Sequence, residues 1–134
     1  MADLERQIFN IHDAASIHLD CGQQLSEIKI AYHTFGKLNQ DKTNVILICH
    51  PLTGSSNAVE WWPKIVGPAL PIDTNKYFII CTNSLGSCYG STGPSSINPK
   101  TKTSFGLDFP IITISDMVRC QRKLIEHLKI KKIK

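Results

Sequence analysis

Hydrophobic and polar positions alternate in the first third of the chain. The segments SIHLD and EIKIAYHTF both alternate, and the polar stretch CGQQ lies between them, so two strands joined by a turn are predicted. In the second segment, Ile28, Ile30 and Tyr32 share one side. A strand with this pattern has one buried face and one wet face, so we expect an antiparallel hairpin at a sheet edge over about residues 16–36.

Two later segments are apolar throughout. VILIC covers residues 45–49 and YFIIC covers residues 77–81. Continuous apolar runs of this length are typical of central strands that are covered on both faces, as in the parallel sheets of α/β proteins. The segment AVEWWPKIVGPALPID between them has room for a short helix and a crossover.

The last part of the chain carries a helix signal. Thr113-Ile-Ser-Asp116 resembles a capping box, and apolar residues follow it at helical spacing. We expect a helix over about residues 114–129, after which IKKIK begins to alternate like the start of another strand. The order of elements predicts an α/β fold with a mostly parallel sheet and an antiparallel edge hairpin.

Composition and charge exclude several classes of protein. The chain has 134 residues, 42% of them hydrophobic, which suits one domain or part of a larger one. Much of the net charge of +4 lies in the terminal KIKKIK, so no nucleic-acid partner is expected. No apolar run approaches the ~20 residues of a membrane span, and the amino terminus lacks the pattern of a secretory signal.

Cysteine and histidine spacing argue against disulfides and metal. The five cysteines form no CxxC pair, which favours reduced thiols in the cytoplasm. Cys49 and Cys81 lie inside apolar runs and are expected to be buried as small hydrophobic side chains. The five histidines lack the spacing of metal ligands, so no metal site is predicted.

The segment HPLTGSSNA, residues 50–58, follows the first apolar strand. Ligands of open α/β sheets bind beyond the carboxyl ends of the strands, and a tight turn there can direct backbone N–H groups at a developing oxyanion. Pro51 has no N–H, so Leu52 and Thr53 are the first candidate donors, while Gly54 permits a close approach. An ordinary strand-to-helix turn explains the pattern equally well.

Other polar residues are expected to have structural roles. His50 is interpreted as a hydrogen-bonding residue of the loop rather than a general base, and Asp73 and Asp116 as turn and cap residues. Trp61 and Trp62 are interpreted as core residues rather than as the lining of a pocket.

The segment Gly86-Ser-Cys-Tyr-Gly90 has the spacing of a nucleophile elbow with Cys88 at its centre. An elbow must open a helix, however, and STGPSSINP, with two prolines, follows instead. The preferred interpretation is a long ordered loop over about residues 83–110 that lines a site. A thiol hydrolase that uses Cys88 stays as an alternative function.

Four segments together resemble the homoserine O-acetyltransferase family over about residues 28–134. They are NVILICHPLTGSSNA, WWPKIVGP, IDTNKYFIICTNSLGSCYGSTGPSSINP and FPIITISDMVRCQ. The resemblance implies an α/β-hydrolase fold and a ping-pong transfer of acetyl from acetyl-CoA to homoserine, for methionine biosynthesis, by a Ser/His/Asp triad. It makes Leu52 an oxyanion-hole N–H donor and puts Thr53 beside the substrate. Succinyl as donor and serine as acceptor stay open.

The resemblance also implies that the chain is the amino-terminal portion of such an enzyme. In the family the nucleophilic serine follows a strand that would begin near KKIK, so the fold is expected to be truncated before the nucleophile elbow and the chain alone to be inactive. VILIC would then be an edge strand that invites association. A non-catalytic module that binds through this open edge is a further alternative.

For the parent enzyme the resemblance implies small-molecule substrates, with acetyl-CoA as co-substrate and no bound cofactor. It further implies a cytoplasmic homodimer without nucleic-acid or membrane partners.

Overall fold

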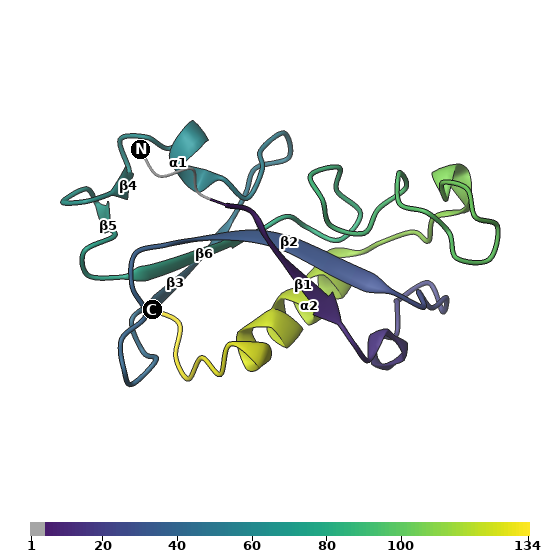
Figure 1. Ribbon diagram of the computed structural model, residues 1–134, viewed down its shortest axis with the longest axis horizontal. Helices are drawn as coiled ribbons and strands as arrows, with labels where there is room; N and C mark the ends of the chain where they lie inside the picture. Colours follow the sequence, from purple (N-terminus) through teal and green to yellow (C-terminus); the bar gives the residue numbers. More distant parts are fainter. Residues whose placement is uncertain (1–4) are drawn as a thin grey trace. The chain divides into compact units, whose positions relative to one another are not determined.

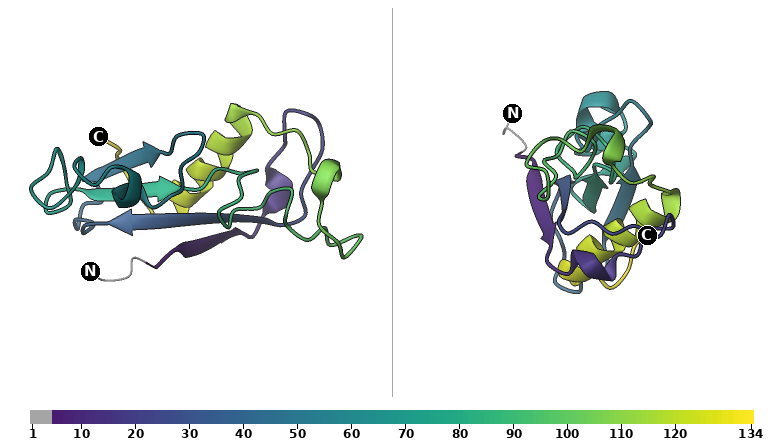
Figure 2. Two further views of the ribbon diagram at one scale, coloured as in Figure 1. Left: turned by 90° about the horizontal axis from the view of Figure 1, so that it is seen from above. Right: turned by 90° about the vertical axis from the view of Figure 1, so that its right-hand side faces the viewer.

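A computed structural model of the protein describes residues 5–134. Four strands form a sheet in the order β1-β2-β6-β3, and two short strands, β4 and β5, pair separately. Strand β6 runs antiparallel to β2 and parallel to β3, and the three lie side by side in both Figure 1 and Figure 2. The elements are β1 Gln7–Ile11, η1 Ala14–Ser16, β2 Ile28–Phe35, β3 Val45–Cys49, α1 Ala58–Trp61, β4 Val66–Gly67, β5 Ile72–Asp73, β6 Phe78–Thr82, η2 Gly106–Asp108 and α2 Ile114–His127.

The two apolar runs form parallel strands, as predicted. Val45 of β3 lies opposite Phe78 of β6, and the register continues to Cys49 and Thr82. Strand β6 has a neighbour on each side, and Ile79, Ile80 and Cys81 are completely buried. The α/β fold class with a mixed sheet is therefore confirmed.

Strand β3 is an edge strand, as the resemblance implied, and it is less covered than its apolar sequence alone suggests. It is the last strand in the order, and beyond it there is only an isolated parallel bridge between Val45 and Ile133, within the described residues. Cys49 is exposed, so the prediction that it is buried is wrong. An apolar sequence shows that a strand can be buried, but its side chains are buried only where other elements pack against them, and β3 has a neighbouring strand on one side only. The predicted strand start in IKKIK pairs with β3 at this one bridge.

The prediction of the first strand of the hairpin is also wrong. The strand beside β2 is Gln7–Ile11, and residues 17–20 form no strand although Ile17 and Leu19 are buried. Their backbone is bonded by side chains instead, because the Asp20 N–H donates to Asp116 Oδ1 and the His18 carbonyl accepts from Arg119 Nη1. Strand β2 lies inside the sheet rather than at its edge.

The described chain divides into two compact units, each with its own core. The first unit comprises residues 5–7, 32–82 and 125–134, and the second comprises residues 8–31 and 83–124. The core of the first unit is Phe35, Ile48, Ala58, Val66, Ile79 and Cys81. The core of the second unit is Ile11, Ala14, Ile17, Leu19, Leu25, Ile28, Ile30, Leu85 and Cys120.

Helix α2 begins at the predicted residue and ends at His127, two residues before the predicted end. Both capping-box bonds are present: the Asp116 N–H donates to Thr113 Oγ1 at 3.2 Å, and the Thr113 N–H donates to Asp116 Oδ2 at 3.0 Å. The buried stripe of the helix includes Cys120 and Leu124, whereas Val118 is 53% exposed.

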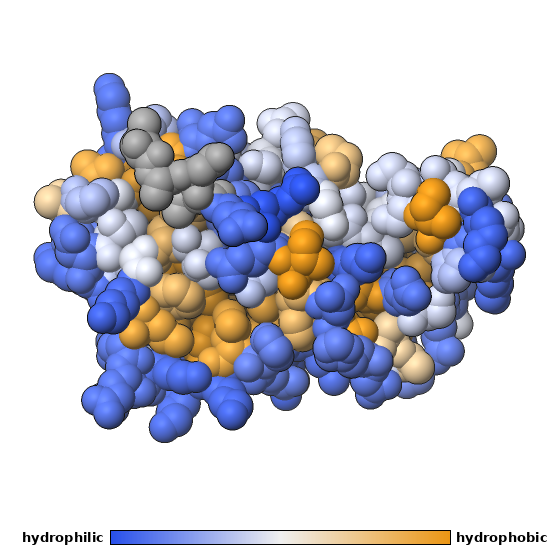
Figure 3. Space-filling model, viewed as in Figure 1, coloured by the Kyte–Doolittle hydropathy of each residue, from blue (hydrophilic) through white to orange (hydrophobic). Residues whose placement is uncertain are grey.

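Hydrophobic side chains reach the surface in several places, as Figure 3 shows for one face. The most exposed large ones include Leu52, Leu107, Ile111 and Ile114. Among the described helices, none is long and apolar enough to cross a membrane.

Candidate functional site

The turn at residues 51–54 follows the carboxyl end of β3 and is closed by its own backbone. The Gly54 N–H donates to the Pro51 carbonyl at 2.8 Å. A Cβ on residue 54 would lie 2.7 Å from Pro51 Cδ, so this tight turn requires glycine. Pro51, Leu52 and Thr53 are exposed, and within residues 5–134 the N–H groups of Leu52 and Thr53 donate to no other group. Two adjacent donors are therefore left for a bound acceptor.

The segment that follows the turn is anchored. Ser55 accepts hydrogen bonds at both its hydroxyl and its carbonyl, from the Asn57 N–H at 3.2 Å and from Trp61 Nε1 at 3.0 Å. The Ser56 hydroxyl lies 2.7 Å from His33 Nδ1 in the interior. An exposed tip on a fixed base is a suitable arrangement for preorganised N–H donors.

His50 and Asp73 have the structural roles that the sequence predicts. His50 Nδ1 lies 2.8 Å from the Pro51 carbonyl, within the same loop. Asp73 Oδ1 accepts hydrogen bonds from the N–H groups of Asn75 and Ala69, each at 2.9 Å, which closes a turn. These two bonds hold the pKa of the Asp73 carboxyl below its usual value.

The two tryptophans divide between the predicted roles. Trp61 is half-buried and packs against the core of the first unit, as predicted. Trp62 is 43% exposed, so its interpretation as a core residue is wrong. The helix α1 between Ala58 and Trp61 is one turn long, and the chain leaves it at Trp62 before Pro63.

Cys88 is not part of a nucleophile elbow. Gly86 and Gly90 both adopt positive φ, at 87° and 102°, but the residues after Cys88 form bends and turns rather than a helix. Cys88 is exposed, and in the described part of the chain no hydrogen bond or ion pair involves its thiol. A cysteine nucleophile needs a base within hydrogen-bonding reach, so the structure does not support a thiol hydrolase at this position.

The loop after β6 is ordered by hydroxyl side chains that bond to the backbone of β2. Ser91 Oγ accepts from the Ala31 N–H at 2.9 Å and donates to the Asn83 carbonyl at 2.6 Å. Thr92 Oγ1 accepts from the Lys29 N–H at 2.8 Å. The loop from Asn83 to Pro110 is thus long and ordered, as predicted, and it contains one short 3-10 turn, η2. Sequence reasoning did not single out Ser91 and Thr92 for this role. The only signal in the sequence is that two residues with hydroxyl side chains are adjacent.

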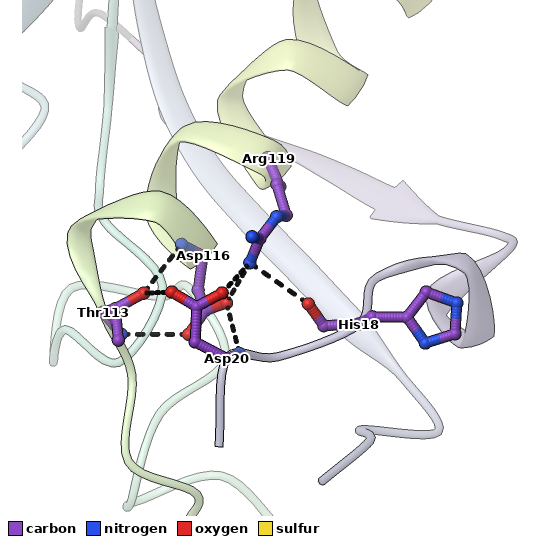
Figure 4. A network of polar contacts seen from close by, with 5 residues as sticks. All are labelled: His18, Asp20, Thr113, Asp116 and Arg119. Atoms are coloured by element: carbon purple, nitrogen blue, oxygen red, sulfur yellow. Dashed lines mark hydrogen bonds and ion pairs between the residues drawn. The ribbon is translucent and has the colours of Figure 1, made fainter. Parts of the chain in front are cut away.

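A charged network fixes the start of α2 (Figure 4). Asp116 is completely buried; its Oδ1 accepts from the Asp20 N–H at 3.0 Å and from Arg119 Nη1 at 2.6 Å. Thr113 Oγ1 donates to Asp20 Oδ2 at 2.6 Å, and Arg119 pairs with Asp20 Oδ1 at 2.7 Å. The hydrogen bond from Thr113, and after it Arg119, lowers the pKa of Asp20.

Both oxygens of the Asp116 carboxylate bind groups of the local fold, so Asp116 is a cap, as predicted. Sequence reasoning missed Asp20 because it meets Asp116 only in the folded chain, across 96 positions of sequence. Arg119 lies three residues after Asp116 on the same helix, so helical spacing is the signal that could have found this pair. Residues 5–134 contain no group of three His, Cys, Asp or Glu side chains that is placed to hold a metal ion.

Comparison with known proteins gives the class of the chain. A sequence profile of the alpha/beta hydrolase fold matches residues 44–134, and the chain belongs to this family. Among its relatives, the homoserine O-acetyltransferase of Methanobrevibacter ruminantium is 50% identical over 97% of the chain. The crystal structure of homoserine O-acetyltransferase from Bacillus anthracis has a TM-score of 0.86 at 34% identity over 96% of the chain. The crystal structure of the esterase E22 has a TM-score of 0.84 at 36% identity, and it also covers 96% of the chain.

The chain spans only part of these proteins. It covers 28% of the Methanobrevibacter ruminantium sequence, 38% of the Bacillus anthracis structure and 39% of the esterase. The resemblance to the homoserine O-acetyltransferase family that the sequence motifs predicted is therefore confirmed over the length of this chain.

Proposed function

We propose that this chain is the part of a homoserine O-acetyltransferase that supplies one side of the oxyanion hole. The observation that carries the proposal is the Leu52 N–H, which lies without a partner among the described residues on an anchored turn after β3. The 50% identity to a homoserine O-acetyltransferase supports the choice of reaction.

In the proposed reaction the turn stabilises charge. A nucleophile attacks the carbonyl carbon of acetyl-CoA, the carbonyl oxygen becomes negative, and the Leu52 N–H donates to it while Thr53 lies beside the substrate. Such donors stabilise the transition state because they are fixed before the charge develops. The tetrahedral intermediate then collapses, CoA leaves as its thiol, and the acetyl group stays on the nucleophile. The hydroxyl of homoserine loses its proton and takes the acetyl group from the nucleophile, which gives O-acetylhomoserine on a route to methionine.

In this proposal the serine, the histidine and the aspartate of the triad come from sequence other than residues 1–134. Acetyl-CoA is a co-substrate rather than a resident cofactor. The complete enzyme is a cytoplasmic homodimer that acts on small molecules.

Ester hydrolysis is a second candidate, favoured by the structural similarity to an esterase. The same oxyanion hole serves both reactions, since both pass through a tetrahedral intermediate. They differ in whether homoserine or water accepts the acyl group.

The test uses a chimera in which residues 28–134 replace the matching segment of the Methanobrevibacter ruminantium acetyltransferase. The release of CoA and the formation of O-acetylhomoserine are measured together, with and without homoserine. We expect transfer to exceed hydrolysis when homoserine is present. Equal CoA release with and without homoserine, and no O-acetylhomoserine, would instead favour the hydrolase.

The substitution Leu52→Pro removes the donor, whereas Leu52→Ala retains it and alters only a side chain that is 99% exposed. We expect Leu52→Pro to lower kcat by about 10²–10³-fold, as for the loss of one oxyanion donor. Leu52→Ala should leave kcat within about twofold. Equal activity of the two variants would refute the role of this N–H.

A further inference from the structure

His33 and Ser56 form a buried hydrogen bond behind the candidate oxyanion turn. The distance between His33 Nδ1 and Ser56 Oγ is 2.7 Å, and the two side chains belong to residues that are 8% and 0% exposed. Both residues belong to the first unit, as does the turn itself. Because the two residues are so deeply buried, neither is in a position to contact a substrate.

The sheet determines where the histidine ring lies. His33 is opposite Cys81 of β6, and Cys81 is in turn opposite Ile48 of β3, so these three residues form one row across the sheet. This row lies just before the carboxyl end of β3, from which the turn departs. The His33 ring also stacks on Phe35, with ring centroids 6.3 Å apart and planes inclined by 15°. The ring is therefore fixed by its strand and by packing.

Ser56 is the point at which the turn is joined to this ring. It follows the exposed tip by two residues, and its carbonyl accepts the Ala58 N–H at 3.0 Å at the start of α1. Within the tip, the Gly54 N–H and His50 Nδ1 both bond the Pro51 carbonyl, whereas the Leu52 side chain is 99% exposed and does not pack on the core. The orientation of the Leu52 N–H thus depends on the segment that Ser56 ties to the sheet.

We infer that His33 is a positioning residue for the oxyanion turn and acts through its hydrogen bond to Ser56; this inference rests on the proposed function. Misplacement of a catalytic group by about 1 Å can cost about 100-fold in rate. A tether from a central strand to the return arm of the turn opposes such a displacement. Its loss should lower kcat, and the KM for acetyl-CoA should change little.

The first experiment measures the tether without any assay of activity. Amide hydrogen exchange is compared between the 134-residue chain and its Ser56→Ala variant. We expect exchange of the hydrogen-bonded amides in residues 50–58, which include those of Gly54, Asn57 and Ala58, to become at least tenfold faster, while exchange in residues 114–124 stays unchanged. Unchanged exchange in residues 50–58 would overturn the inference.

The second experiment measures acetyl transfer by the chimera. We expect His33→Leu and Ser56→Ala each to lower kcat about tenfold with KM within twofold, and the double variant to be no worse than either. His33→Asn, which keeps a hydrogen-bonding group near the position of Nδ1, should recover most of kcat. Thr34→Val is the matched control, since it removes a hydroxyl of the same strand that bonds Gln7 instead of the loop.

The outcomes separate the two claims. If Leu52→Pro lowers kcat but His33→Leu and Ser56→Ala do not, the positioning role is overturned and the proposed function stands. If Leu52→Pro has no effect, the proposed function fails, and the role inferred for His33 fails with it. A fall in kcat that Thr34→Val reproduces, and that His33→Asn does not relieve, would mark a general loss of structure and would also overturn the inference.

Discussion

The Asp116 carboxylate accepts a hydrogen bond from the backbone N–H of Asp20 at 3.0 Å, across 96 positions of sequence. The same carboxylate caps its own helix by accepting the Thr113 N–H. One buried side chain therefore holds both the start of α2 and the segment that precedes β2. This segment does not need a strand partner, because side chains bind its backbone.

Removal of this carboxylate should destabilise the fold. We expect Asp116→Ala to lower the free energy of unfolding by about 2–4 kcal/mol, because buried donors left without an acceptor cost ~1–3 kcal/mol each. Thr113→Ala, which removes only part of the cap, should cost about 1 kcal/mol. Urea unfolding measures both, with the exposed Asp108→Ala as a control expected within about 0.5 kcal/mol of the parent chain. An Asp116→Ala midpoint equal to that of the control would contradict the role of the network.

The stability of the chain should fall in acid. Hydrogen bonds lower the pKa of Asp73 and of Asp20 in the folded chain. A lowered folded-state pKa stabilises the fold above the unfolded value of ~3.9, and this contribution is lost as the pH falls through the folded value. We expect the difference in Tm between the parent chain and Asp73→Asn to be largest near neutral pH and to shrink below about pH 4. A difference that stays constant down to pH 2 would argue against this linkage.

The cysteines should fall into two classes of reactivity. Burial raises the pKa of Cys81 and of Cys120 to about 12, whereas Cys21, Cys49 and Cys88 are exposed. Because the thiolate is the reactive form, a thiol reagent at pH 8 should modify the three exposed cysteines quickly and the two buried ones only after unfolding. Mass spectrometry of the labelled peptides identifies each site. Rapid labelling of Cys120 in the native chain would show that the core of the second unit opens readily.

Gly36 should tolerate substitution far less well than Gly22, although both have positive φ. A Cβ on Gly36 would lie 2.2 Å from the Tyr77 carbonyl oxygen, whereas nothing lies within 4 Å of one on Gly22. Gly22→Ala should cost about 1–2 kcal/mol for its backbone conformation alone. Gly36→Ala should cost about 2–5 kcal/mol, because the steric clash adds to that strain. Thermal unfolding of the two variants tests this prediction. Equal Tm values would mean that the turn after β2 relaxes to accommodate a Cβ at residue 36.

Local patterns were sufficient for some of the fold and part of the candidate site. The apolar runs at residues 45–49 and 77–81 identified the parallel pair to within one residue, and Thr113 with Asp116 identified the start of α2. The turn after the first run was recognised from Pro51 and Gly54, whose constraints act over a few bonds. The unbonded Leu52 N–H of the described chain follows from the same local chemistry, and its role in catalysis stays a prediction.

Local sequence patterns did not predict the features that depend on residues far apart in the chain. SIHLD alternates like a strand, yet Asp116 and Arg119 bond its backbone, and Gln7–Ile11 takes the place beside β2. Cys49 has the neighbours of a core residue but is exposed, since β3 has a strand on one side only apart from the bridge to Ile133. The tether from His33 to Ser56 exists because the sheet order places β2 two strands from β3.

The sequence by itself therefore determined the two apolar strands, the start of the helix after Thr113 and where a turn could present N–H groups, because backbone preferences and capping act between near neighbours. Tertiary structure alone decided that Gln7–Ile11 lies beside β2, that Cys49 is exposed, and what holds the turn in place. Those outcomes depend on contacts between residues far apart in the chain, and spacing along the sequence does not encode them locally.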